Sequence, residues 1–264
     1  MAAESAAGAA AGDDVVLETR GLTKRFGELV AVDQVDLAVR RGEFRSVIGP
    51  NGAGKTTLFN LITGPLRPSE GAVFFDGQDI TGLPAHERIR RGIARSFQLS
   101  NIFGGLTVRE NVRLAAQSGD YDRFSPRQAL FDSLSAFPGV EARTDRVLEQ
   151  IGLADQADAH AGALAYGDQR RLEIGLVLAT DPDLVLLDEP TAGMSGEETE
   201  RTIDLIHEVL ADKTLVLVEH DIDLVMEVSD AIAVLHQGSL IADGTPEDIS
   251  ADEEVQRAYL GGHA

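Results

Sequence analysis

The sequence predicts an α/β protein built on a mainly parallel sheet, and three observations carry this prediction. Short apolar runs alternate with helical patterns along most of the chain. Residues 184–187 and 215–218 are apolar throughout, as expected for strands buried on both faces of a parallel sheet. A glycine-rich loop at residues 49–54 joins one expected strand to one expected helix. Together these features favour a sheet that is covered by helices on both sides.

The elements follow in chain order. Residues 1–14 are rich in Ala and Gly and lack a basic start, so we interpret them as a disordered leader and not as a secretory signal. Residues 15–264 are expected to form one domain. Strands are expected at residues 15–19, 29–39, 44–48, 73–76, 184–187, 215–218, 231–235 and 240–242, and helices at residues 56–63, 147–151, 169–179, 197–210 and 222–228.

The stretch from about residue 107 to residue 164 differs from the rest, because it lacks convincing strands. Its helical patterns are interrupted by Gly119, Pro126, Pro138 and Gly139. We interpret it, together with the helix that follows, as a helical insertion in the α/β core that spans about residues 107–180.

Composition excludes several classes of protein. The chain has 264 residues, 43% of them hydrophobic, and no apolar run approaches the ~20 residues that a membrane span needs. It has no cysteine, which excludes disulfide scaffolds, zinc–thiolate sites, Fe–S clusters and thiol nucleophiles.

The charge is strongly acidic. Asp and Glu number 44 against 23 Lys and Arg, which gives a net charge of −21, and the lysines are Lys24, Lys55 and Lys213. Such a surface repels phosphates, so we expect no nucleic-acid partner. Scattered acids and few lysines favour adaptation to high salt, where screening removes most of the self-repulsion. The alternative is an acidic protein without that adaptation.

The loop at residues 49–56 matches the pattern G-x-x-x-x-G-K-[ST] in full, between a strand and a helix. Its glycines let backbone N–H groups close around phosphates, and the helix N-terminus adds partial positive charge. We expect Lys55 to reach the β- and γ-phosphates of a nucleotide and Thr56 to ligate Mg²⁺. The predicted nucleotide-binding residues here are Gly49, Pro50, Asn51, Gly52, Ala53, Gly54, Lys55, Thr56 and Thr57.

Two acidic residues follow the apolar run at residues 184–187. Asp188 ends the expected strand, where it can hold Mg²⁺ directly or through water, and Glu189 can face the attacking water as general base. An acid pair after a strand also fits a helix N-cap, but its combination with the phosphate loop favours catalysis.

Two further residues are candidates for the same site, and one residue is unusual. The amide of Gln98 can reach the metal or the water, and His220 follows the strand at residues 215–218, where it can contact the γ-phosphate. Arg45 places a charge inside the strand that leads into the phosphate loop. We expect Arg45 to face a sheet edge or to pair with an acid.

The order of these motifs resembles that of the ATP-binding subunits of ABC transporters, over about residues 15–262. Residues 164–173, Leu-Ala-Tyr-Gly-Asp-Gln-Arg-Arg-Leu-Glu, stand at the place of that family's Leu-Ser-Gly-Gly-Gln signature. They are similar to the variant signature of the LivG-type subunit of branched-chain amino acid importers. The resemblance implies a P-loop NTPase (ABC ATPase) core with a mainly parallel sheet, an antiparallel β part near the N-terminus and a helical insertion subdomain.

The resemblance also implies roles for individual residues. Phe26 stands at the position where the family stacks an aromatic ring on adenine. Gln98 corresponds to the loop that senses γ-phosphate and metal, and His220 corresponds to the family's switch histidine. Ser195 stands where many members have an Asp in the D-loop. The signature residues, which would bind ATP held by the opposite subunit, are Ala165, Tyr166, Gly167, Asp168 and Gln169.

The apolar segment at residues 99–111, directly after Gln98, is expected to dock a partner; the alternative is that it covers the insertion's own core. Phe103 is one of its apolar residues.

The expected function is that of an ATPase. Its catalytic residues would be Glu189, His220 and Gln98, its metal ligands Thr56, Gln98 and Asp188, and its cofactors ATP and Mg²⁺. The resemblance implies a subunit of an ABC importer for branched-chain or related amino acids, peripheral at the cytoplasmic face of the membrane. Its partners would be permease subunits, a second ATPase subunit (the same chain or a paralogue) and, indirectly, an extracellular solute-binding protein.

Two alternatives remain at this point. The ATPase of a lipopolysaccharide exporter is similar in sequence, but the variant signature disfavours it. A soluble ABC ATPase acting in DNA repair or translation is disfavoured by the single cassette and by the acidic surface.

Overall fold

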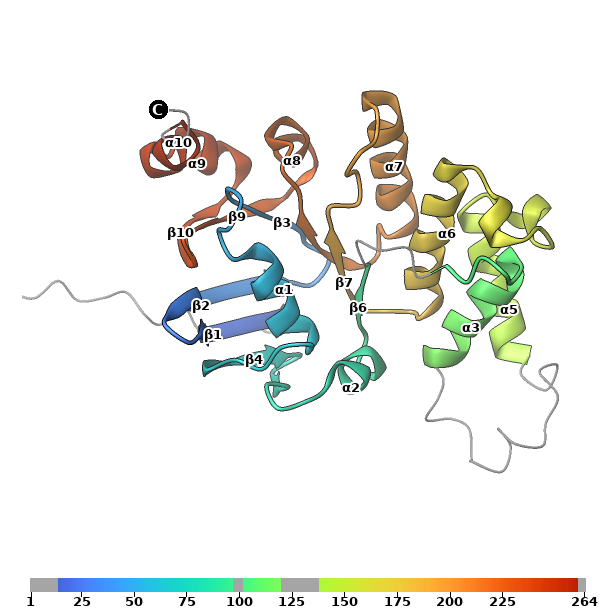
Figure 1. The fold of residues 1–264 in the computed structure, drawn as a ribbon, viewed down its shortest axis with the longest axis horizontal. Helices are drawn as coiled ribbons and strands as arrows, with labels where there is room; N and C mark the ends of the chain where they lie inside the picture. Colours follow the sequence, from blue (N-terminus) through green and yellow to red (C-terminus); the bar gives the residue numbers. More distant parts are fainter. Residues whose placement is uncertain (1–13, 97–101, 120–137, 261–264) are drawn as a thin grey trace, which may run out of the picture.

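The computed structural model describes residues 14–96, 102–119 and 138–260, which form two sheets and their covering helices (Figure 1). The central sheet has six strands in the order β10-β9-β3-β8-β7-β6. β3, β6, β7, β8 and β9 pair in parallel, and β10 pairs antiparallel with β9. Its strands are β3 (Phe44–Ile48), β6 (Ile93–Arg95), β7 (Leu184–Asp188), β8 (Thr214–Val218), β9 (Ala231–His236) and β10 (Ser239–Gly244).

The second sheet is antiparallel, with the strand order β2-β1-β4-β5. Its strands are β1 (Val15–Phe26), β2 (Leu29–Arg40), β4 (Glu70–Phe75) and β5 (Gln78–Asp79). One buried cluster joins this sheet to the central sheet and to α1 (Lys55–Thr63); it includes Leu17, Val47, Phe59 and Leu186. The helix that follows the phosphate loop is therefore held between the two sheets.

Three helices pack together at one end of the molecule, beyond β6 and β7 (Figure 1). They are α3 (Val108–Gly119), α5 (Pro138–Gln150) and α6 (Tyr166–Ala179), accompanied by the short 3₁₀ turns η3 (Ala154–Gln156) and η4 (Ala161–Ala163). Val112, Val147 and Leu172 lie in their common core. The remaining helices are α2 (Ala85–Arg90), α7 (Gly196–Val209), α8 (Ile222–Val228), α9 (Pro246–Ala251) and α10 (Glu253–Leu260).

The predicted fold class is confirmed. The central sheet is mainly parallel, an antiparallel sheet lies near the N-terminus, and helices form the insertion. β5, β6, α2, α9 and α10 were not predicted, because elements of two to eight residues are too short to show a clear period. The expected leader, residues 1–14, falls almost entirely outside the described residues. None of the helices in the described part of the chain is long and apolar enough to cross a membrane.

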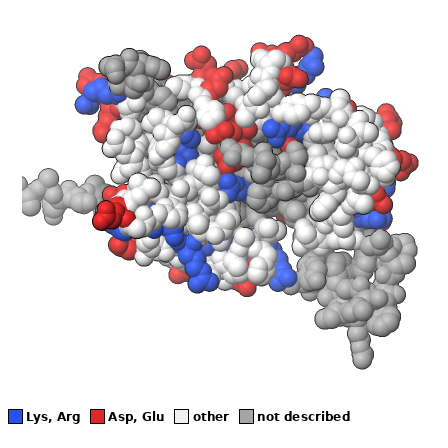
Figure 2. Space-filling model, viewed as in Figure 1, with Lys and Arg blue, Asp and Glu red and all other residues white. Residues whose placement is uncertain are grey.

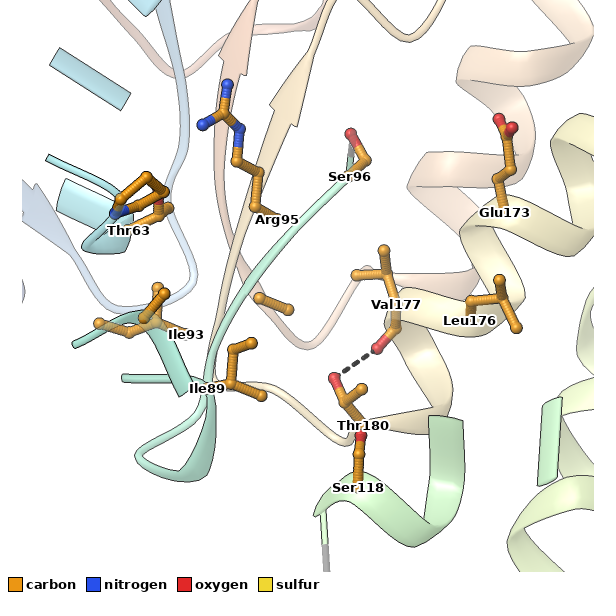
Figure 3. Close-up of a pocket in the computed structure, with 13 residues that line it drawn as sticks. Thr63, Ile89, Ile93, Arg95, Ser96, Ser118, Glu173, Leu176, Val177 and Thr180 are labelled. Carbon is orange, nitrogen blue, oxygen red and sulfur yellow. Dashed lines mark hydrogen bonds between the residues drawn. The ribbon is translucent and has the colours of Figure 1, made fainter. Parts of the chain in front are cut away.

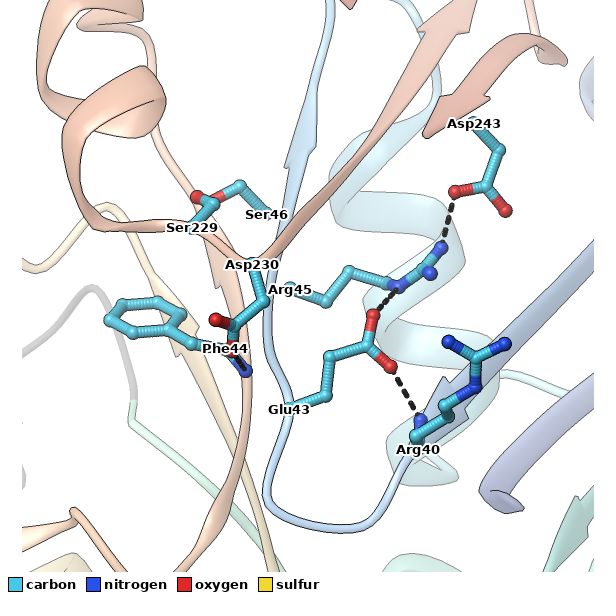
Figure 4. Close-up of polar contacts among 8 residues, drawn as sticks. All are labelled: Arg40, Glu43, Phe44, Arg45, Ser46, Ser229, Asp230 and Asp243. Carbon is cyan, nitrogen blue, oxygen red and sulfur yellow. Dashed lines mark hydrogen bonds and ion pairs between the residues drawn. The ribbon is translucent and has the colours of Figure 1, made fainter. Parts of the chain in front are cut away.

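Arg45 pairs with acids, the second of its two predicted settings (Figure 4). Its register partner on β9 is Ala231, whose small side chain lets the guanidinium cross to Asp243 on β10. Nη1 donates to Asp243 Oδ1 at 2.5 Å and Nε to Glu43 Oε1 at 2.7 Å. Burial raises the pKa of Asp243 despite the opposing effect of Arg45. The pair fixes β10, the antiparallel edge strand, to β3.

Candidate active site

The carboxyl ends of β3, β7 and β8 meet at one edge of the central sheet, because these strands are parallel neighbours. Val47 of β3 lies in register with Val218 of β8, which in turn lies in register with Asp188 of β7. The segments that follow the three strands are the phosphate loop, the stretch beginning at Glu189 and the stretch beginning at Glu219. Residues far apart in the chain are therefore brought to one place.

The phosphate loop connects β3 to α1 and needs glycine at specific positions. Gly49 and Gly54 have φ values of 156° and 105°. A Cβ at Gly54 would lie 2.4 Å from the carbonyl oxygen of Ala31, and a Cβ at Gly49 would lie 2.2 Å from that of Leu235. Backbone of β2 and β9 thus approaches the loop so closely that no larger residue fits without a shift.

Lys55 begins α1 and is 7% exposed. Its Nζ donates to the carbonyl oxygens of Gly49 at 2.6 Å and Pro50 at 3.2 Å. Burial lowers the pKa of Lys55, while the nearby Glu189 and Asp188 carboxylates raise it. Within the described residues, Lys55 Nζ is held by loop carbonyls, and it can exchange these acceptors for phosphate oxygens.

One pocket runs from the phosphate loop to the β1–β2 hairpin. The predicted residues Asn51, Gly52, Ala53, Gly54, Lys55, Thr56, Thr57 and Glu189 line it, together with Phe26. Phe26 is 46% exposed, and the centroid of its ring lies 5.1 Å from Lys24 Nζ. Leu29 and Gln237 also line the pocket, and sequence reasoning had not singled them out. An exposed ring and an exposed Leu29 at the mouth of a phosphate pocket can cover a nucleobase.

Glu189 and His220 are in direct contact. Nε2 of His220 lies 3.1 Å from Oε2 of Glu189. Glu189 has a φ of 50°, in the left-handed region, and its N–H donates to the Val218 carbonyl at 2.8 Å. Non-glycine residues that their neighbours hold in this backbone conformation are concentrated at active sites.

Asp188 is 2% exposed and has only one of its carboxylate oxygens paired. Oδ2 accepts a hydrogen bond from Arg95 Nη2 at 2.5 Å. Oδ1 is buried and has no hydrogen-bond partner among the described residues. An orphaned carboxylate oxygen and the Thr56 hydroxyl are oxygen donors of the kind that Mg²⁺ prefers, so the residues present fit this ion.

The signature residues other than Gln169 line a pocket with Met194 and Glu198, and this pocket is separate from the one at the phosphate loop. Ala165 is the N-cap of α6 and supplies no side-chain hydrogen bond. Tyr166 is 51% exposed, and the guanidinium of Arg170 lies over its ring. Two of the signature side chains form hydrogen bonds within this chain. The Asp168 carboxylate accepts one from Gln156 Nε2 at 3.0 Å, and the Gln169 amide donates one to the Leu164 carbonyl at 3.2 Å. Ser195 has a local role, because it caps α7 in a capping box with Glu198.

Sequence reasoning missed Glu219, which is 2% exposed and lies directly before His220. Its Oε1 accepts hydrogen bonds from the Thr191 N–H at 3.1 Å and from the Thr191 hydroxyl at 2.5 Å, and its Oε2 from the His220 N–H at 3.2 Å. An acid directly after a fully apolar strand was the available signal. Gln98, predicted as catalytic and as a metal ligand, lies outside the described residues.

An apolar groove separates the sheet from the helical insertion (Figure 3). It is formed by the end of α1, by α2, by β6 and by α6, and its residues include Ala85, Ile89, Ile93, Leu176 and Val177. Arg95 lies on its wall, so the groove reaches the residue that pairs with Asp188. Of the predicted docking segment, Val108 is buried and Ile102 packs on the insertion core, whereas Phe103 is 61% exposed.

The phosphate loop between β3 and α1, with Asp188 at the end of the parallel strand β7 on the other side of β8, defines a P-loop nucleotide-binding protein. The chain matches the family model for ABC transporters over residues 32–192 and the model for branched-chain amino acid ATP-binding cassette transporters over residues 239–264. It therefore belongs to the ABC transporter ATPases, and the resemblance inferred from its motifs is confirmed.

Curated relatives and solved structures agree with this assignment. The chain is 43% identical over 252 residues to the high-affinity branched-chain amino acid transport ATP-binding protein BraF of Pseudomonas aeruginosa, covering 93% of this chain and 98% of that one. It is 42% identical over 255 residues to LivG of Escherichia coli (strain K12), with the same coverage. A nucleotide-free ATP-binding cassette from an ABC transporter superposes with a TM-score of 0.79 at 30% identity, covering 93% of this chain and 98% of that chain.

Proposed function

We propose that this chain is the ATP-hydrolysing subunit of an ABC importer for branched-chain or related amino acids, bound to a membrane permease at the cytoplasmic face. The solute assignment is supported by the curated relatives, which are named for high-affinity branched-chain amino acid transport. It is supported independently by the C-terminal match at residues 239–264, outside the segment that the ABC transporter family model covers.

The observation that carries the catalytic proposal is the 3.1 Å contact between Glu189 and His220 at the pocket that Lys55 enters. Water attacks the γ-phosphorus, the bond between that phosphorus and the β–γ bridging oxygen breaks, and ADP leaves. The Glu189 carboxylate takes the proton of the water, and His220 fixes the direction in which that carboxylate faces. Lys55 donates to the β- and γ-phosphates in place of the loop carbonyls.

Mg²⁺ would be held by Thr56 and by the unpaired Oδ1 of Asp188, and Gln98 is proposed as a further ligand. When bound it would neutralise charge on the β- and γ-phosphates. Phe26 would stack on the base, with Leu29 beside it.

The signature residues are proposed to bind ATP held by a second ATPase subunit. Their pocket is separate from the phosphate loop of the same chain, which supports a site completed by a partner. The N-terminus of α6 has no side-chain cap, so its N–H groups are available to phosphate oxygens despite the loss of the family's Ser hydroxyl at Ala165.

The permease is proposed to insert an apolar helix into the groove of Figure 3. The groove lies between two packed bodies, the sheet with α1 and α2 on one side and α6 on the other, and it is mostly apolar. Ile89 on its rim is 38% exposed, as expected of an unpartnered contact residue. Phe103 does not line the groove but is a second exposed apolar residue, in the predicted docking segment.

The catalytic proposal is tested with Glu189→Gln and Lys55→Ala. Glu189→Gln keeps the shape of the side chain but not the base, so we expect ATP binding, hydrolysis reduced ~10²–10⁴-fold, and an ATP-bound dimer on size exclusion. Lys55→Ala should lose ATP binding itself. Wild-type phosphate release by Glu189→Gln would show that the base lies elsewhere.

The transport proposal needs a different readout. Phe103→Asp should reduce uptake of branched-chain amino acids by cells while the purified subunit keeps its basal ATPase activity. Leu114→Asp is a matched control, because Leu114 is also an exposed apolar residue, 43% exposed, but lies on α3 outside the predicted docking segment at residues 99–111. Unchanged uptake with Phe103→Asp would exclude docking through this residue.

A saline cytoplasm is proposed from the net charge of −21. In Figure 2 acidic side chains are spread along much of the outline of the face shown, and basic ones are fewer. Scattered charge of one sign is destabilising in dilute salt and tolerated in concentrated salt.

A further inference from the structure

The guanidinium of Arg95 contacts three functionally distinct parts of the molecule. Its Nη2 donates to Asp188 at 2.5 Å, and its Nη1 donates to Asn60 Oδ1 at 2.6 Å. Its guanidinium carbon lies 5.7 Å from the centroid of the Phe59 ring. Asn60 and Phe59 belong to α1, the helix that begins at the phosphate loop. The same side chain lines the apolar groove (Figure 3).

The sheet register explains why Arg95 reaches Asp188. Arg95 on β6 lies in register with Leu186 on β7. Side chains two residues apart on a strand point to the same face, so Asp188 lies diagonally across from Arg95 on that face. The contact therefore follows from two regular strands and needs no special loop conformation.

The charge of Arg95 beside Asp188 affects how strongly this carboxylate can bind a metal ion. The Asp188 side chain is 0% exposed and that of Arg95 is 11% exposed, so water screens the pair little. A buried carboxylate without a cation is strongly unfavourable, and Arg95 supplies the cation on Oδ2 while Oδ1 has no partner. A divalent cation on Oδ1 would then share one carboxylate with a guanidinium.

We propose that Arg95 is the resident counter-ion of Asp188. It neutralises the carboxylate while no metal is bound, and it lowers the affinity of the site for a divalent cation because two cations on one buried carboxylate repel each other. Arg95 is thus a positioning residue that acts through Asp188. This inference rests on the proposed function, in which Asp188 holds the metal.

The test measures binding of Mn²⁺ alone to the full chain, by electron paramagnetic resonance of the free ion. Arg95→Gln keeps a hydrogen-bond donor toward Asp188 but removes the charge, so we expect Mn²⁺ to bind at least about tenfold more tightly than to the wild type. Arg95→Lys keeps the charge, and its affinity should stay near that of the wild type. The rise in melting temperature on adding Mg²⁺ should be larger for Arg95→Gln than for the wild type.

One further variant, Asp188→Asn, separates the possible failures. Asp188→Asn should abolish Mn²⁺ binding; if binding persists, the metal assignment in the proposed function is wrong and this inference falls with it. If Asp188→Asn abolishes binding but Arg95→Gln binds Mn²⁺ with wild-type or lower affinity, Arg95 is a structural residue only and the proposal is overturned.

Arg170→Gln is the matched control, because Arg170 is similarly buried and pairs with Glu173 at 2.6 Å, away from Asp188. Its Mn²⁺ affinity should be unchanged. If Arg95→Gln is unfolded without metal, recovery of its cooperative melt on adding Mn²⁺ supports the proposal. Failure to recover at any Mn²⁺ concentration, while the double variant Arg95→Gln/Asp188→Asn folds, overturns it.

Discussion

Two polar side chains, those of Glu219 and Ser195, fix backbone segments through hydrogen bonds, and neither lines the pocket at the phosphate loop. Glu219 accepts hydrogen bonds from Thr191 and from the His220 N–H, so one buried carboxylate holds the segments that carry Glu189 and His220. Ser195 begins α7 with a reciprocal capping box. At the residue scale, the geometry of catalysis therefore depends on side chains that do not face the phosphates.

Replacing Glu219 with Ala should lower both stability and turnover. The N–H groups of Thr191 and His220 would lose their acceptor, at a cost of about 1–3 kcal/mol for each group left buried and unpaired. We expect kcat to fall more than the apparent KM for ATP rises, because the phosphate loop is not altered. Urea denaturation and steady-state ATPase assays measure the two effects, and wild-type kcat in this variant would contradict the positioning role.

Two substitutions of Ser195 test whether its side chain acts as the N-cap of α7. Ser195→Ala removes the hydroxyl that accepts from the Glu198 N–H and should cost about 1 kcal/mol of unfolding free energy. Ser195→Asp should cost almost nothing, because Asp is an equally good N-cap. Chemical denaturation of both variants decides the point; equal loss in both would mean that the hydroxyl has another role.

At the scale of the elements, α1 is fixed at both ends. Its N-terminus is the phosphate loop, and its C-terminus meets Arg88 of α2. Arg88 is 1% exposed and donates from Nη1 to the carbonyls of Leu61 and Ile62 at 2.7 and 2.6 Å, which are among the last carbonyls of α1. Burial lowers the pKa of Arg88 to about 10, so the side chain stays charged at neutral pH.

Arg88→Met should destabilise the protein by at least about 3 kcal/mol, since several buried carbonyls would lose their donor. Arg88→Lys keeps the charge but not the planar fork, and should recover only part of the loss. Thermal and urea denaturation check both variants. The affinity for ATP should fall in parallel with stability, because the phosphate loop begins the same helix, and unchanged stability of Arg88→Met would contradict this account.

At the scale of the whole molecule, the net charge of −21 sets how the fold responds to salt. At ~0.1 M ionic strength the Debye length is about 10 Å, and at ~1 M it is about 3 Å, so repulsion among scattered acids is strongly reduced in concentrated salt.

We therefore expect the melting temperature to rise between ~0.1 M and molar KCl, measured by thermal denaturation. A variant in which exposed Glu200, Glu208, Asp212 and Glu227 become the neutral amides should show a smaller rise. A melting temperature that is flat or falls with KCl would favour an acidic protein without salt adaptation.

Much of this molecule follows from local sequence. The phosphate loop, the buried strands β7 and β8, and the order of Asp188 and Glu189 lie in short contiguous segments whose residue types dictate the conformation. The loop needs glycine where Ala31 and Leu235 approach it, and the apolar runs need burial on both faces. The family signature is likewise a contiguous segment, so the class of protein was available from the sequence.

The long-range pairs were decided only by the tertiary structure. Arg95 meets Asp188 across 93 positions of the chain, Thr191 meets Glu219 across 28, and Arg45 meets Asp243 across 198. Each pair joins a buried charge to a polar or charged partner, and which residue is the partner depends on which strands are neighbours and in which register. A local pattern shows that such a charge needs a partner, but the distances that select the partner exist only once the sheet has formed.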